Sequence, residues 1–112
     1  MDITVEPYKR CDVVKISGRI DSETVPDLRR TLTGLTNSGK FFLVLDMTEV
    51  TFVSSAGWWT LIDTQKTCKK NGRGEVVLAN LGDRIQSSLE LVGMNEYFRT
   101  FKNVVDAVGN IG

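Results

Sequence analysis

One stretch of the chain, from Leu43 to Ile62, constrains the fold more than any other, because its physical character changes three times. It begins within an apolar run, Phe41 to Leu45, that is typical of a buried strand. The next segment, Asp46 to Thr51, is polar and has the composition of a turn. Apolar residues at helical spacing then begin at Trp58. The stretch therefore predicts a strand, a turn and a helix in close succession.

Four small residues stand immediately before this helix: Ser54, Ser55, Ala56 and Gly57. They place one or two hydroxyl groups beside backbone N–H groups that have no partner within the helix. A serine at such a position can be an N-cap, part of an anion site or a phosphoacceptor, since a phosphate would meet the positive end of the helix dipole. The spacing alone favours the cap, which is the commonest of these roles.

Length and composition fit one compact domain. The chain has 112 residues, enough to bury a core without disulfides or metals. With 41% apolar and 25% charged residues, it has the composition of a folded protein. The sequence contains no repeat or linker, so we expect a single domain over residues 1–112, with its core at about 3–108.

The charges argue against nucleic acids and membranes as partners. The 14 basic and 14 acidic residues leave no net charge, and no basic stripe follows the chain. The one local cluster, Lys66, Lys69, Lys70 and Arg73, stands at an expected helix end, where cations complement the helix dipole; a phosphate-binding patch is the less favoured interpretation. No signal peptide and no long apolar run is present, so we expect a soluble, cytoplasmic protein.

Histidine is absent, which excludes a Ser-His-Asp triad and His-containing zinc sites. The two cysteines, Cys11 and Cys68, are too few for a cysteine-only zinc site, and their isolation predicts buried free thiols. A hydrolase that used Ser55 would need a lysine base, and no Ser-x-x-Lys spacing occurs near it. We therefore expect no enzymatic activity, no metal and no cofactor.

The N-terminal part predicts two strands and a helix. Residues 3–8 alternate in polarity, with a proline near the end, and predict an edge strand. A short turn leads to a second strand over residues 13–20, which implies an antiparallel pair. In the helix that follows, Thr24 and Asp27 approximate a capping box, and Pro26 is acceptable in the first turn. The face expected to pack on the sheet consists of Val25, Leu28, Leu32 and Leu35.

The helix after the small residues is expected to run to about Lys70. Its inward stripe consists of Trp58, Leu61, Ile62, Gln65 and Cys68. Trp59 falls outside this stripe. It is either an anchor for a partner or a side chain that lies flat on the domain's own surface.

The remaining segments complete an α/β fold. We expect a strand at Glu75 to Ala79, a helix at Asp83 to Val92, a short strand within Phe98 to Phe101 and a helical turn at Val104 to Val108. Because a helix connects the second strand to the third, these two strands should be parallel. The predicted fold is a mixed sheet of four to five strands with three or four helices, mainly on one face.

The segment around the small residues resembles the signature of the STAS domain in the anti-sigma factor antagonist family. That pattern has an acidic strand end, an aromatic-apolar pair and Asp-Ser-Ser/Thr-Gly before an apolar helix. The matching residues are Asp46, Phe52, Val53, Ser54, Ser55, Ala56 and Gly57. Ser54 replaces the usual Asp, and Ala56 replaces the usual Ser or Thr. Two further motifs resemble the family, Gly18-Arg19-Ile20-Asp21 at the end of the second strand and Leu91-Val92-Gly93-Met94.

The resemblance implies a role in bacterial transcription regulation by partner switching. In its unmodified form such a protein binds an anti-sigma factor serine kinase of the GHKL ATPase type, and the target of that kinase is released. Phosphorylation breaks the complex, and a metal-dependent serine phosphatase restores the first state. The alternative is a STAS domain that is not phosphorylated and binds a protein or a small ligand constitutively.

The resemblance also implies the site residues. Ser55 matches the phosphoacceptor by its register with Gly57, and Ser54 is the alternative. Asp21 should lie on the same rim, where it either meets an arginine of the partner or caps the first helix. The expected partner surface consists of Asp21, Ser22, Ser54, Ser55, Ala56, Gly57, Trp58 and Trp59.

Overall fold

The protein is a five-stranded sheet covered by helices on both faces. We describe it from a computed structural model, which describes residues 1–71 and 73–112. The strand order is β1-β2-β3-β4-β5; β1 is antiparallel to β2, and all other neighbours are parallel. The strands are β1 (Asp2–Pro7), β2 (Asp12–Ile20), β3 (Phe42–Val53), β4 (Glu75–Ala79) and β5 (Thr100–Phe101). The helices are α1 (Val25–Asn37), α2 (Ser55–Lys70), α3 (Asp83–Leu91), the short 3₁₀ helix η1 (Asn95–Tyr97) and α4 (Val104–Asn110).

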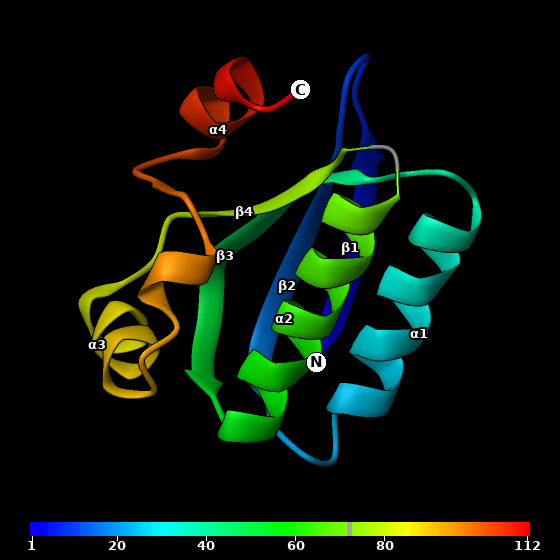
Figure 1. The fold of residues 1–112 in the computed structure, drawn as a ribbon. Helices are drawn as coiled ribbons and strands as arrows, with labels where there is room; N and C mark the ends of the chain where they lie inside the picture. Colours follow the sequence, from blue (N-terminus) through cyan, green and yellow to red (C-terminus); the bar gives the residue numbers. More distant parts are fainter. Residues whose placement is uncertain (72) are drawn as a thin grey trace.

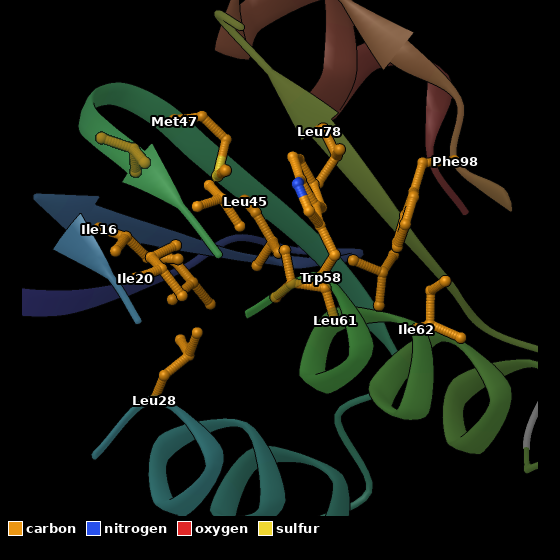
Figure 2. Close-up of a cluster of buried hydrophobic side chains, with 14 of the residues drawn as sticks. Ile16, Ile20, Leu28, Leu45, Met47, Trp58, Leu61, Ile62, Leu78 and Phe98 are labelled. Carbon is orange, nitrogen blue, oxygen red and sulfur yellow. The ribbon is translucent and has the colours of Figure 1, made fainter. Parts of the chain in front are cut away.

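The two faces of the sheet bury separate apolar clusters. The larger cluster lies between the sheet and α1, α2 and α3, with Trp58 in the middle of it (Figure 2). The smaller one lies under α4 and includes Val44, Val77 and Ala107. Three of the four α-helices therefore cover one face, as predicted.

Most of the expected elements are present. The structure confirms the antiparallel pair of β1 and β2 and the parallel pair of β2 and β3. It also confirms the helices α1, α2 and α3. All five residues of the inward stripe of α2 are buried. Of the expected last strand only Thr100–Phe101 pairs with β4, while Phe98 is part of the larger cluster.

The prediction that the third strand ends at Leu45 and is followed by a turn was wrong. The strand β3 continues from Asp46 to Val53 in parallel with β2, beyond the last residue that pairs with β4. Irregularities in register between Lys15 and Ser17, and between Gly18 and Arg19, accompany this extension. Among the described residues, no strand pairs with the other side of this part of β3, which exposes polar residues that resemble a turn in the sequence.

The predicted capping box at Thr24 was also wrong. Thr24 has helical backbone angles, and its side chain does not cap α1. Its hydroxyl instead donates to the carbonyl oxygen of Arg19 (2.8 Å) and accepts from the backbone N–H of Asp21 (2.9 Å). The threonine therefore closes the turn between β2 and α1.

Both cysteines are free and buried, as predicted. Burial raises the pKa of the Cys68 thiol to about 11, and burial together with the nearby Asp12 raises the pKa of Cys11. Both thiols are therefore protonated and unreactive near neutral pH. In the described part of the chain, no helix has the length and apolar character needed to cross a membrane.

One buried polar side chain completes the edge of β4. The strand β5 pairs only with Leu78 and Ala79. Below this pairing, the side-chain oxygen of Gln65 accepts from the backbone N–H of Val76 (2.7 Å), and its nitrogen donates to the carbonyl oxygens of Val76 (3.0 Å) and Tyr97 (2.6 Å). The amide of Gln65 thus takes the place of the missing length of β5.

Replacement of Gln65 by leucine should destabilise the protein by about 2–4 kcal/mol, because it leaves buried backbone groups of Val76 without partners. Denaturation in urea, followed by circular dichroism, measures the effect. Lys66→Leu, at an exposed position of the same helix, is the control and should change the stability by less than about 0.5 kcal/mol. Equal stability of the two variants would contradict this role of the amide.

Candidate functional site

The predicted corner exists, and Ser54 is its cap. Ser54 has extended backbone angles and precedes the first residue of α2. Its side-chain oxygen accepts from the backbone N–H of Gly57 (3.1 Å), and its own N–H donates to the carbonyl oxygen of Ile20 (2.8 Å). The Ser54 hydroxyl is therefore already used by the fold.

Gly57 brings α2 into close contact with the ends of two strands. A Cβ at this position would lie 2.7 Å from Cγ2 of Ile20 and 3.0 Å from Cγ1 of Val53. No side chain fits there without displacing β2 or β3. Because glycine has no side chain, the first turn of α2 can lie directly against the ends of β2 and β3.

Ser55 is the first residue of α2, and it is exposed. Among the described residues, no side chain or backbone group makes a hydrogen bond with its hydroxyl. The backbone N–H groups of Ser55 and Ala56 lie in the first turn, where the helix supplies no acceptor for them. The site thus combines a free hydroxyl with the positive end of a helix of 16 residues.

Asp21 lies beside this corner, because Ile20 is bonded to Ser54. One oxygen of the Asp21 carboxylate accepts from the backbone N–H groups of Glu23 (3.0 Å) and Thr24 (3.2 Å), and the other lies 3.3 Å from Nε of Arg19. Partial burial opposes ionisation, but these donors outweigh it, so the pKa of the Asp21 carboxyl lies below its usual value. The Asp21 carboxylate thus stabilises the turn that leads into α1, which is close to its predicted role as a cap for that helix. A contact with an arginine of a partner stays a prediction.

The two tryptophans occupy opposite environments. Trp58 is completely buried, and its indole N–H donates to Oγ of Ser88 (3.0 Å). Trp59 has 54% of its surface exposed, one turn from the serines. The expectation that Trp59 lies outside the inward stripe is confirmed.

The structure divides the expected partner surface into exposed and buried residues. Ser22, Ser55, Ala56 and Trp59 are exposed, and Asp21 and Ser54 are partly exposed. Gly57 and Trp58 are buried, so they support the corner from below and offer no surface to a partner in this conformation.

Sequence reasoning missed an aromatic and basic pair beside the corner. The guanidinium of Arg19 lies over the ring of Phe52, 4.3 Å from its centre, and Phe52 is 39% exposed. The two residues are register partners on β2 and β3. The exposure of Phe52 could have been inferred from its apolar neighbour Val53, because adjacent residues of a strand point to opposite faces of the sheet.

The arrangement suits recognition and modification. No group of three potential metal-ligating side chains occurs among residues 1–71 and 73–112. A hydroxyl at an exposed helix N-terminus can accept a phosphoryl group from an enzyme that approaches it, and the surface around it can dock a protein.

The sequence matches the family described as STAS domain over residues 2–107. It is 28% identical to the anti-sigma-B factor antagonist of Staphylococcus aureus over 83 residues, which are 74% of this chain and 76% of that protein. It is 29% identical to the protein of the same name from Listeria monocytogenes over 107 residues, which are 93% and 92% of the two chains.

Two solved structures have the same fold. An anti-sigma factor antagonist from Mycobacterium paratuberculosis aligns with a TM-score of 0.85 and 26% identity, over 98% of this chain and 92% of that one. The phosphorylated form of the Bacillus cell fate determinant SpoIIAA aligns with a TM-score of 0.74 and 14% identity, over 96% and 97%. Because the family match spans nearly the whole sequence and the fold agrees with it, this chain belongs to the STAS domain family.

Proposed function

We propose that this protein is an anti-sigma factor antagonist, which docks on an anti-sigma factor through the corner at Ser55. The names of the relatives from Staphylococcus and Listeria support this role. The observation that carries the proposal is the free, exposed hydroxyl of Ser55 at the start of α2. In this role the protein binds and regulates another protein, and it catalyses no reaction itself.

We further propose Ser55, rather than Ser54, as the phosphoacceptor. The hydroxyl of Ser54 accepts the N–H of Gly57, and its modification would disturb a cap that contributes about 1 kcal/mol. The hydroxyl of Ser55 has no such role. SpoIIAA, which shares the fold, has been solved in a phosphorylated and in an unphosphorylated form.

The partner would be an anti-sigma serine kinase of the GHKL ATPase type, and a metal-dependent serine phosphatase would reverse the reaction. A phosphoserine carries a charge of about −1.5 to −2. Beside the N–H groups of α2 this charge costs the free protein little. Inside an interface it must lose its hydration, and about 5.5 kcal/mol is enough to change a mostly bound protein into a mostly free one.

One feature favours the alternative, a STAS domain that binds its partner without phosphorylation. Ser54 stands where the family signature has an aspartate, so no carboxylate is adjacent to Ser55 in the chain. If kinase recognition requires that carboxylate, Ser55 would remain unmodified. Mass measurement after kinase treatment separates the two candidate functions.

Incubation with the cognate kinase and ATP should add one phosphoryl group to the wild type and to Ser54→Ala, and none to Ser55→Ala. The reason is that only Ser55 presents an unoccupied hydroxyl. Intact-protein mass spectrometry measures the result. A phosphorylated Ser55→Ala variant would contradict the assignment, and an unmodified wild type would favour the constitutive alternative.

The charge at position 55 should decide binding. We expect Ser55→Ala to remain bound to the kinase in the presence of ATP, and Ser55→Asp to bind at least about tenfold more weakly, because a carboxylate must be desolvated in the interface. Isothermal titration calorimetry measures both affinities. Equal affinities of the two variants would count against a switch at this position.

Trp59 should anchor the partner. Its replacement by alanine is expected to weaken kinase binding about tenfold or more, since exposed aromatic residues that become buried in an interface commonly dominate its energy. The free energy of unfolding should change little, because the side chain is 54% exposed. Tyr8→Ala is the control: Tyr8 is 43% exposed, between β1 and β2 at the opposite end of the molecule (Figure 1). Similar losses in both variants would exclude a specific contact at Trp59.

A further inference from the structure

The end of the molecule opposite Ser55 gathers cations from separate parts of the chain. Lys9 and Arg10 lie between β1 and β2, Lys40 follows α1, Lys69 lies in the last turn of α2 and Arg73 precedes β4. The strands β2, β3 and β4 all begin at this edge of the sheet, because they are parallel (Figure 1). The fold therefore brings basic residues from distant parts of the sequence together on one surface.

These cations surround two adjoining hollows. The first has a volume of about 170 Å³, and Lys9, Arg10 and Lys40 lie on it. The second has about 460 Å³, and its cations are Lys69, Arg73 and Arg99. Phe42 lines both hollows.

Arg10 and Gly112 lie between the two hollows. Gly112 lines the second one, and a Cβ on Gly112 would lie 3.4 Å from Cβ of Arg10, which lines the first. We call the two neighbouring hollows together the basic channel and define it by its cations: Lys9, Arg10, Lys40, Lys69, Arg73 and Arg99.

Few acidic side chains line the channel. Two acidic side chains line it, Asp12 and Glu75. Asp12 is only 6% exposed, and both carboxylate oxygens of Glu75 accept from Arg99 (2.7 and 2.9 Å). The other five cations of the channel have no acidic side chain within 4.0 Å among the described residues.

The cations near Ser55 differ in this respect. Arg19 pairs with Asp21, Arg30 with Asp27, and Arg29 lies 3.6 Å from Asp63. Like charges that are held together without counter-charges repel one another and oppose the compact state. A ligand of opposite charge relieves this repulsion, which makes the basic channel a candidate for anion binding.

We propose that the basic channel binds an acidic segment of another protein in extended conformation. The side chains of an extended segment point alternately to opposite sides, so its carboxylates can reach both hollows while its backbone crosses Phe42. A membrane surface fits less well, because stable interfacial binding combines charge with inserted apolar groups. Of the exposed large apolar side chains, Tyr8 alone lines the first hollow, and none lines the second.

This site is independent of the function proposed for Ser55, because it lies at the other end of the domain (Figure 1). The lining of the channel shares no residue with the corner at Ser55.

The test is a calorimetric titration of the full chain, at low salt, with a peptide of consecutive glutamates, which in extended conformation presents carboxylates on both sides. The double variant Lys40→Glu/Lys69→Glu removes one cation from each hollow and should bind the peptide about tenfold more weakly or worse. The matched control, Arg84→Glu/Lys102→Glu, changes the net charge equally at exposed positions outside the channel and should stay within about twofold of the wild type. Binding to the wild type should weaken as salt is added.

Several results would overturn the proposal. They are an absence of peptide binding at low salt, an equal loss in both double variants, or tighter binding of phosphatidylglycerol vesicles or polyuridylate RNA than of the peptide. Circular dichroism of the two variants shows whether each is folded. Ser55→Asp should bind the peptide as the wild type does, so a failure of this test leaves the function proposed for Ser55 unaffected.

Discussion

Helix α2 approaches the ends of β2 and β3 so closely that only a glycine fits at position 57. The methyl carbons of Ile20 and Val53 occupy the space that a side chain would need. This contact fixes the direction in which α2 leaves the sheet. It also places the N–H of Gly57 where the hydroxyl of Ser54 accepts it. The next residue, Ser55, must then lie on the outer side of the first turn, and the rest of the candidate site follows from that position.

Two adjacent hydroxyl groups thus have separate tasks. Ser54 closes the end of the helix and continues the pairing between β2 and β3 by one hydrogen bond. Ser55 makes no contribution of this kind, so a group added to it changes the surface and leaves the cap intact. A regulator that works by binding needs this separation, because its surface must change while its fold stays the same.

Much of the architecture follows from local patterns, and the remainder depends on contacts that the sequence does not display. The spacing of apolar residues was sufficient to predict α2 and its inward stripe. It failed for β3, because the polar residues after Leu45 remain in a strand that has a neighbour on one side only. The amide of Gln65 replaces part of a strand, which no pattern within α2 could reveal. The exposure of Ser55 was predictable from the helix start, whereas the basic channel comes from segments that only the parallel sheet brings together.

The unequal burial of Trp58 and Trp59 gives the protein two optical probes in consecutive positions. Indole emission shifts to longer wavelength as the surroundings become more polar, so the solvent-facing ring should emit to the red of the enclosed one. A protein that covers Trp59 would shift only the red component, whereas unfolding would alter both. Intrinsic fluorescence can therefore distinguish docking from loss of structure without any attached label.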